Sequence, residues 1–195
     1  MSDRHSAKRA LLVVDIQNDF VEGGALGVTG GTAVATRVSE LLQGEHGYDM
    51  VVASRDWHNA SGDNGGHFAL DAEPDFVNTW PVHCVAGSFG AEYHSALQDA
   101  EFDVEIFKGQ GEPAYSAFEG SSADGLKLEE ILKEAGVKHL DVVGIATDYC
   151  VLQSSEDAYW AGFRVRVLKD FVAGVAAETS AKALDELRAM GAEVV

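Results

Sequence analysis

Six short, mostly apolar segments rich in β-branched residues recur along the chain, and they constrain its fold more than any other feature. They are residues 10–15 (ALLVVD), 49–54 (DMVVAS), 103–107 (DVEIF), 140–145 (LDVVGI), 164–168 (RVRVL) and 192–195 (AEVV). Near-continuous apolar runs of this length are typical of strands that are buried on both faces of a sheet. We therefore predict a six-stranded sheet with both faces covered.

Helical patterns lie between several of these segments. Apolar residues recur on one helical face at Val34, Val38, Leu41 and Leu42, at Leu128, Ile131, Leu132 and Ala135, and at Ala183, Leu184 and Leu187. Gly136 and Gly191 follow two of these stretches, as glycine commonly does at a helix end. Strands that alternate with helices form a parallel sheet with helices on both sides. We predict the α/β class, with a three-layer α/β/α fold around a mainly parallel six-stranded sheet.

The length of 195 residues suffices for one well-packed core and is short for two. We predict a single domain over residues 1–195, in which about residues 1–8 form a flexible extension. Residues 56–100 are rich in Gly, Asp, Asn and His and form a predicted insertion. Loops of that length inside a compact domain are usually functional.

The charge of the chain limits its partners. Asp and Glu number 32 against 14 Lys and Arg, which gives a formal net charge of −18. Such a charge repels phosphate backbones and anionic lipids, so we expect neither nucleic acid nor a membrane as a partner. The N-terminal segment lacks the apolar core of a secretion signal, and no run reaches the roughly 18 apolar residues of a membrane span, so we expect a cytoplasmic protein. The sequence is compatible with a homo-oligomer.

Three reactive side chains come at the ends of predicted strands. Asp15 ends the first strand, Lys108 follows the third, and Cys150 follows the fourth after the turn ATDY. Parallel strands end at one edge of a sheet, where such folds bind ligands, so we expect these side chains to share a crevice. A helix beginning near Cys150 would favour its thiolate, Lys108 would add positive charge, and Asp15 would accept the proton. The combination indicates a cysteine nucleophile, although each residue alone also fits a cap, a solvated charge or an inert buried thiol.

The insertion contains a second set of residues with chemical potential. Asp56 and His58 are two positions apart, and His67 and His83 follow in the same segment. Carboxylate and imidazole ligands suit zinc, iron or manganese. The pattern predicts one divalent metal ion, and the alternative is a polar loop whose histidines cap turns. Cys84, next to His83, is interpreted as a packed thiol.

Five segments, taken in order, give the chain a specific resemblance. They read VVDIQNDFVEGGAL, RDWH followed by HF, WPVHC, FKG followed by AYSAFEG, and GIATDYCV. Together they resemble the nicotinamidase/pyrazinamidase branch of the isochorismatase-like cysteine hydrolases, over essentially the whole chain after its N-terminal extension. The spacing from His58 to His67 is longer than in the commonest forms of this family.

The resemblance implies a role for each motif. It implies a catalytic triad of Asp15, Lys108 and Cys150. It implies a metal-ligand set of Asp56, His58, His67 and His83. It implies that the substrate pocket is walled by Phe20, Trp80 and Tyr115, while Tyr149 shapes its floor. It also implies a cis peptide bond between Ile145 and Ala146, which would turn the amides of Ala146 and Cys150 into an oxyanion hole.

The activity implied by the resemblance is hydrolysis of nicotinamide to nicotinate and ammonia through a thioester on Cys150, with pyrazinamide as a further substrate. The metal would bind the ring nitrogen and orient the carboxamide. Three other functions stay open at this point. They are an amidohydrolase of the same fold acting on carbamoyl or ureido substrates, a hydrolase whose metal activates water while Cys150 is structural, and a non-catalytic interaction protein.

Overall fold

The computed structural model describes residues 7–195, and its centre is a sheet of six strands that all run parallel. The strands are β1 (Lys8–Val14), β2 (Met50–Asp56), β3 (Val104–Lys108), β4 (Val137–Ile145), β5 (Arg164–Ala173) and β6 (Glu193–Val194). Their spatial order is β3-β2-β1-β4-β5-β6. The predicted α/β class is confirmed, and the sheet is parallel throughout rather than mainly parallel.

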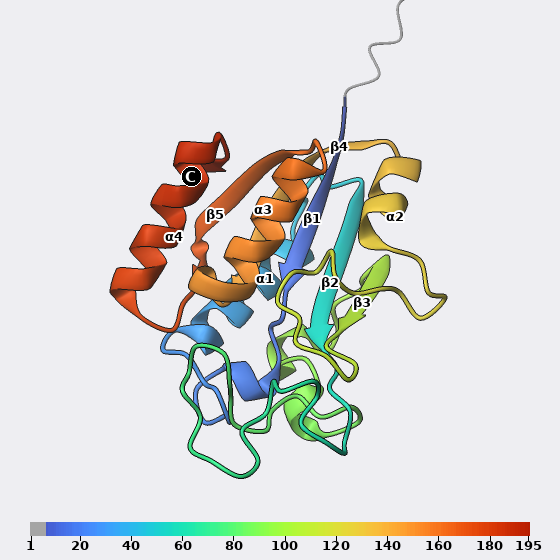
Figure 1. Cartoon of the computed structure of the whole chain (residues 1–195). Coiled ribbons are helices and arrows are strands. Elements are labelled where there is room, and N and C mark those ends of the chain that lie inside the picture. The colour runs from blue at the N-terminus through green and yellow to red at the C-terminus, as the bar shows by residue number, and fades with distance from the viewer. Residues whose placement is uncertain (1–6) are drawn as a thin grey trace, which may run out of the picture.

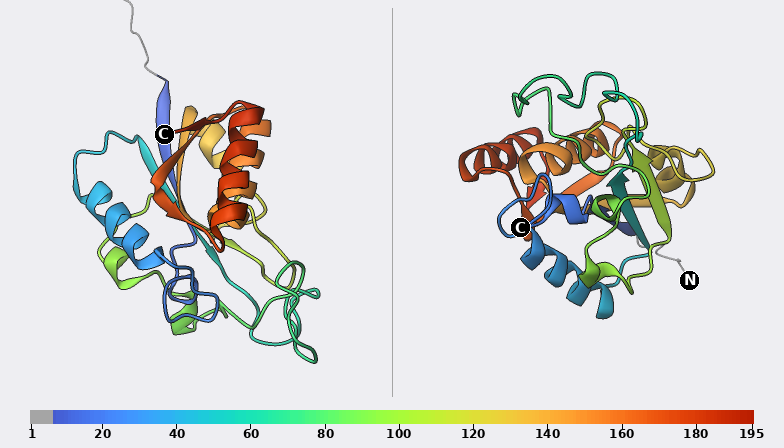
Figure 2. Two further views of the ribbon diagram at one scale, coloured as in Figure 1. Left: turned by 90° about the vertical axis from the view of Figure 1, so that its left-hand side faces the viewer. Right: turned by 90° about the horizontal axis from the view of Figure 1, so that it is seen from below.

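Helices cover both faces of this sheet (Figure 1). They are α1 (Gly31–Gln43), α2 (Leu128–Glu134), α3 (Leu152–Trp160) and α4 (Ala177–Met190). Helix α1 packs on one face, and α2, α3 and α4 pack on the other, with the sheet between them (Figure 2). The three predicted layers are therefore present.

Strand β1 shows why the strand segments are continuously apolar. Leu11 and Val13 belong to the cluster that includes Val38 of α1, whereas Leu12 and Val14 belong to the cluster under the other three helices. All four strand residues are 0% exposed. A strand with a helix layer on each face buries every side chain, so its sequence does not alternate.

The strand order reverses between β1 and β4. Strand β1 is paired with β2 on one side and with β4 on the other. Open α/β sheets bind ligands at the carboxyl edge of such a switch point. Asp15 follows β1 and Ala146 follows β4. The topology alone thus places both residues at the predicted crevice.

The connection from β2 to β3 lies along this carboxyl edge (Figure 1). Its helical structure consists of two short 3-10 helices, η2 (Phe89–Ala91) and η3 (Ser95–Leu97). The predicted insertion over residues 56–100 occupies most of this connection. The predicted extension over residues 1–8 lies largely outside the described residues, and β1 already begins at Lys8. Among residues 7–195, no helix combines the length and the apolar character needed to cross a membrane.

Candidate active site

The three reactive side chains at the strand ends meet around one lysine. The ammonium of Lys108 lies 2.7 Å from Oδ2 of Asp15 and 3.7 Å from the sulfur of Cys150. It also forms an ion pair with Oδ1 of Asp56. The side chains of Lys108 and Asp15 are both 0% exposed. One cation therefore contacts two carboxylates and a thiol in a buried cluster.

Backbone turns at the strand ends direct these groups toward each other. Asp15 has a φ of 47°, a left-handed conformation that Asp adopts more readily than most residues. After β4, the peptide bond between Ile145 and Ala146 is cis, as the resemblance implies. A π-helical turn, η4 (Thr147–Val151), follows and leads into α3. Cys150 therefore lies within the first helical turn rather than just before it.

Burial dominates the protonation of Cys150. It raises the pKa of the thiol well above its usual value, and the charge of Lys108 offsets only part of this effect. Burial also raises the pKa of Asp15 against the opposing influence of Lys108. For Lys108 itself, burial acts to lower the pKa, but the carboxylates of Asp15 and Asp56 raise it well above its usual value. The raised pKa favours a thiol as the resting form of Cys150, so burial opposes the thiolate that Lys108 and the helix start would favour.

Three imidazoles face one another next to this charged cluster. Ligand atoms of His58, His67 and His83 all lie within 4.8 Å of one another, and all three residues are buried. Nε2 of His58 and Nδ1 of His67 are buried without a hydrogen-bond partner among the described residues. Buried polar atoms are nearly always paired. The orphaned nitrogens therefore fit a bound cation, and imidazole ligands suit zinc, iron or manganese.

Asp56 connects the two clusters. Its Oδ2 lies 3.5 Å from Nε2 of His58 and 3.6 Å from Nε2 of His83, while its Oδ1 pairs with Lys108. Burial acts to raise the pKa of this carboxyl, but Lys108 and the two histidines hold it well below its usual range. One ionised carboxylate thus faces the ammonium and the imidazoles at the same time.

Backbone carbonyls orient the imidazole rings. Nδ1 of His58 lies 2.7 Å from the carbonyl of Gly109, and Nδ1 of His83 lies 2.7 Å from that of Pro81. With Nδ1 as the donor, Nε2 is left as the metal-binding atom. A Cβ at position 109 would come within 2.4 Å of Cε1 of His58, so only glycine allows this approach. Burial, together with the neighbouring histidines, lowers the pKa of His67 to about 3, which keeps its ring neutral.

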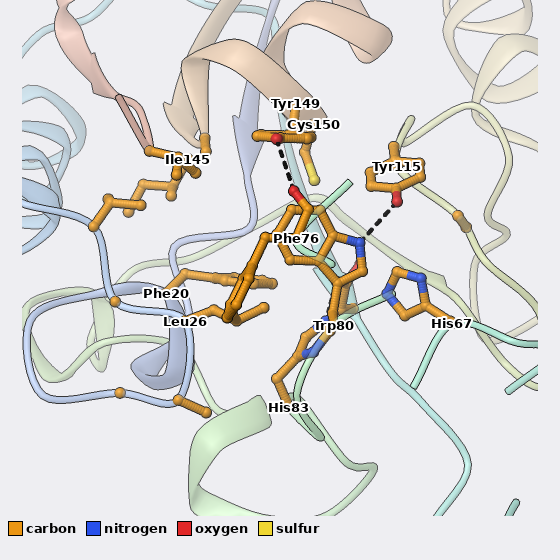
Figure 3. Close-up of a pocket in the computed structure, with 18 residues that line it drawn as sticks. Phe20, Leu26, His67, Phe76, Trp80, His83, Tyr115, Ile145, Tyr149 and Cys150 are labelled. Atoms are coloured by element: carbon orange, nitrogen blue, oxygen red, sulfur yellow. Dashed lines mark hydrogen bonds and ion pairs between the residues drawn. The ribbon is translucent and has the colours of Figure 1, made fainter. Parts of the chain in front are cut away.

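A cavity of about 430 Å³ opens onto both clusters, and the sulfur of Cys150 points into it (Figure 3). Asp56, His67 and His83 also line this cavity. Its aromatic lining consists of Phe20, Phe76, Trp80, Tyr115 and Tyr149. Nε1 of Trp80 donates a 2.9 Å hydrogen bond to the hydroxyl of Tyr115, and the Trp80 and Tyr149 rings meet edge to face at 5.2 Å. The aromatic residues named from the sequence thus surround the same space as the thiol and the imidazoles.

Residues 9–195 match the family model described as the isochorismatase domain. The chain belongs to the isochorismatase family. It is 46% identical over 187 residues to the nicotinamidase/pyrazinamidase of Mycobacterium tuberculosis, and the alignment covers 96% of this chain and 98% of that protein.

Solved structures of isochorismatase-family proteins resemble this fold closely. The pyrazinamidase of Pyrococcus horikoshii, in complex with zinc, aligns with a TM-score of 0.81 and 36% identity, covering 96% of this chain and 98% of that one. PnC1 from L. infantum, in complex with nicotinate, aligns with a TM-score of 0.83 and 31% identity, covering 97% and 92%.

The turn that carries the thiol of this isochorismatase-family protein also carries the backbone amides of Ala146 and Cys150. The N–H groups of Tyr149 and Val151 both donate to the carbonyl of Ala146, at 3.1 and 3.0 Å. Ala146 and Cys150 also line the cavity. The two amides named from the sequence as an oxyanion hole thus belong to cavity-lining residues.

Several contributors to the site are missing from the sequence interpretation. Ser54 donates a 2.8 Å hydrogen bond to Oδ1 of Asp15, and the fully buried Gln17 binds the backbone of Asp56. Leu26 lines the cavity, and the glycine-rich motif that contains it is the signal by which it could have been found. Phe76 lies in an irregular part of the insertion, where no pattern marks a single residue as functional.

Proposed function

We propose that this isochorismatase-family protein is a nicotinamidase, an amidohydrolase that converts nicotinamide to nicotinate and ammonia and also accepts pyrazinamide. The observation that carries the proposal is that the thiol of Cys150 and the histidine cluster open into one aromatic-walled cavity. A pyridine carboxamide carries an electrophilic carbon and a basic nitrogen on one small ring. Similarity to a nicotinamidase/pyrazinamidase over nearly the whole chain supports this substrate.

In the proposed mechanism, Cys150 is the nucleophile and Asp15 is the base. Because the thiol is the resting form, its proton has to leave as the sulfur attacks the carboxamide carbon. The raised pKa of Asp15 makes its carboxylate a stronger acceptor for this proton. Lys108, 3.7 Å from the sulfur, stabilises the negative charge that develops there. This step forms the carbon–sulfur bond and leaves Asp15 protonated.

The amides of Ala146 and Cys150 would then bind the oxyanion of the tetrahedral adduct. Asp15 returns the proton to the amide nitrogen, the carbon–nitrogen bond breaks, and ammonia leaves a thioester on Cys150. A water molecule gives a proton to Asp15 and attacks the thioester carbonyl. The carbon–sulfur bond breaks, nicotinate is released, and the proton on Asp15 restores the thiol.

The side chains proposed to hold one divalent ion, whether zinc, iron or manganese, are Asp56, His58, His67 and His83. When bound, the ion supplies a Lewis-acidic anchor for the ring nitrogen, which orients the carboxamide toward the sulfur. Phe20 and Trp80 would hold the plane of the ring and exclude water from the thiol. We place this chemistry in the cytoplasm, where the two thiols stay reduced.

A comparison of nicotinamide with benzamide tests the proposal. Benzamide has the same shape and the same carboxamide but no ring nitrogen. In metal-replete protein, kcat/KM for ammonia release should be roughly 10⁴-fold lower with benzamide, because a site built around one polar contact rejects an analogue that lacks it on this scale. Pyrazinamide, which keeps that nitrogen, should be hydrolysed. Chelation should stop nicotinamide hydrolysis, and a divalent ion should restore it.

The alternatives give different results in the same assay. An apolar slot without an anchor discriminates by only roughly 10- to 200-fold per methylene-sized change. Comparable kcat/KM values for both amides would therefore remove the ring anchor and favour an amidohydrolase for carbamoyl or ureido substrates. Hydrolysis that survives complete alkylation of Cys150 would favour a hydrolase in which the metal activates water.

A further inference from the structure

Gln17 is 0% exposed, and its side-chain amide makes three hydrogen bonds to backbone groups. Oε1 accepts from the N–H of Asp56 at 2.8 Å. Nε2 donates to the carbonyls of Asp56 and Ala91, at 2.8 and 2.9 Å. If the side-chain amide were flipped, the N–H of Asp56 would face an NH₂ group and the carbonyls of Asp56 and Ala91 would face an oxygen, so this orientation is the one that pairs all three groups. Every polar group of the side chain is thus committed to these two residues.

Two of these hydrogen bonds replace bonds that a continued sheet would supply. Strands β1 and β2 stay in parallel register as far as Val14 and Ser54, and the N–H of Asp15 still donates to the carbonyl of Ser54 at 3.1 Å. In a continued parallel ladder, the N–H of Asp56 would next donate to the carbonyl of Asp15, and its own carbonyl would accept from the N–H of Gln17. The left-handed turn at Asp15 prevents both, because the N–H of Gln17 donates to the carbonyl of Asp15 instead, at 2.8 Å.

The backbone held in this way carries the carboxylate that the two clusters share. Asp56 directs Oδ1 to Lys108 and Oδ2 toward Nε2 of His58 and His83. The side chain of Asp is short, so the position of its backbone decides whether both oxygens reach their partners. A displaced backbone at Asp56 would weaken the contact with the imidazoles or the contact with the ammonium.

We propose that Gln17 is a positioning residue for the metal site. Its side-chain amide makes the hydrogen bonds to the Asp56 backbone that β1 would make if it did not turn at Asp15. These bonds fix the position of Asp56, so that its carboxylate contacts Lys108 and the histidines at the same time. The inference rests on the proposed function in taking Asp56 and the histidines as metal ligands. Loss of a hydrogen-bonding group behind a ligand typically lowers metal affinity or activity by roughly 10- to 100-fold.

Gln17→Met, which keeps the approximate shape but not the amide, tests this with Co²⁺ as the probe. The Co²⁺ dissociation constant is measured by chelator competition, the visible d–d spectrum is recorded for the loaded protein, and kcat and KM are measured with nicotinamide. We expect roughly 10- to 100-fold weaker Co²⁺ binding, altered d–d bands and a lower kcat at saturating Co²⁺. Gln17→Asn, whose amide is one methylene too short, should change all three in the same direction.

Tyr48→Phe is the matched control. It removes the 2.7 Å hydrogen bond from the Tyr48 hydroxyl to the buried Asp141. Tyr48 lies just before β2, at the amino ends of the strands, whereas Cys150 lies at their carboxyl ends. This variant should lower Tm while leaving the Co²⁺ dissociation constant and spectrum unchanged. A loss of stability alone therefore does not reproduce the expected result.

Folded Gln17 variants with the Co²⁺ affinity and spectrum of the wild type would overturn the proposal. Failure of both variants to fold where Tyr48→Phe stays folded would also overturn it, since Gln17 would then serve the fold as a whole. So would a wild-type protein that binds no Co²⁺. Because binding is measured without nicotinamide, a wild-type protein that binds Co²⁺ but releases no ammonia would refute the proposed function and leave this test intact.

Discussion

Replacing Lys108 with Met should destabilise the protein strongly, because it leaves two buried carboxylates without a counter-charge. Lys108 contacts both Asp15 and Asp56, and its side chain is 0% exposed. Removing one partner of a buried ion pair costs about 3–5 kcal/mol. Met keeps most of the aliphatic stem, so little of the loss should come from packing. Against a typical total of about 5–15 kcal/mol, such a change is a large fraction of the stability.

The pH dependence of this loss follows from the two carboxylates. In the wild type, the pKa of Asp56 lies below the unfolded value of about 3.9, so its stabilisation is present above that pH and is lost as the pH falls through the folded pKa. Without Lys108, burial should raise the pKa of Asp15 further than in the wild type and should raise that of Asp56 above the unfolded value. A raised pKa stabilises below the unfolded value, and this stabilisation is lost as the pH rises. The deficit of the variant should therefore grow from about pH 4 to about pH 7, by about 1.4 kcal/mol for each unit of pKa shift.

Urea unfolding of both proteins with chelator present, at several pH values across this range, measures the effect without a contribution from the metal. Lys133→Met is the matched control. Lys133 pairs with Glu129 on the surface of α2, and its side chain is 53% exposed. Such a pair contributes about 0–1 kcal/mol. A loss in Lys108→Met as small as in this control, or one that does not change with pH, would refute the argument that Lys108 neutralises the buried carboxylates.

Two further predictions concern the cysteines. Cys150→Ala should abolish ammonia release while leaving Tm nearly unchanged, because it removes the nucleophile but little buried volume, whereas Cys84→Ser should lower Tm and retain activity. Near-normal ammonia release by folded Cys150→Ala would falsify the covalent mechanism, and complete loss in metal-loaded Cys84→Ser would show that the wrong nucleophile was chosen. Iodoacetamide should alkylate Cys150 slowly at neutral pH, with a rate that still rises above the usual thiol pKa of about 8.5, and Lys108→Met should slow the reaction further. Mass spectrometry follows the alkylation rate as the pH is raised. A rate that stops rising at a pH near the pKa of a free cysteine would contradict the assignment of a resting thiol.

All six strands can be predicted from the sequence. In β1, β2 and β4 the apolar signal is continuous because most of their residues are buried, whereas β3, β5 and β6 are only partly buried and are marked by shorter apolar runs. Their ends cannot be predicted as well. The sequence predicts β5 over residues 164–168, but the strand extends to Ala173. Its end is missed because the exposed polar residues Lys169 and Asp170 interrupt the apolar run. Strand β2 likewise extends to Asp56, where polar side chains enter the site. The apolar pattern of a strand ends at the carboxyl edge of the sheet, where polar side chains such as Asp56 line the site instead of the core.

The sequence indicates the reactive residues of the site better than their supports. Metal binding and nucleophilic attack require particular side chains, so Cys150, Lys108 and the histidines leave recognisable motifs. Gln17 forms hydrogen bonds with backbone N–H and C=O groups. Every residue type except proline has both groups, so no residue type in the sequence identifies the partner of Gln17. The direction of the Cys150 pKa is also hidden, because it depends on how completely the folded protein excludes water from the thiol.

The placement of buried charge argues against the non-catalytic alternative. Replacing buried ionic groups with apolar residues of similar volume is often neutral or stabilising, by about 1–4 kcal/mol, so stability alone gives no reason for the cluster around Lys108. The site also leaves two imidazole nitrogens without partners in the described part of the chain. Unpaired buried groups weaken a fold, and these two nitrogens are atoms that a metal ion would bind. The residues that reduce stability are those that the proposed reaction uses. Active sites commonly lower the stability of a fold in this way, because their residues are selected for function.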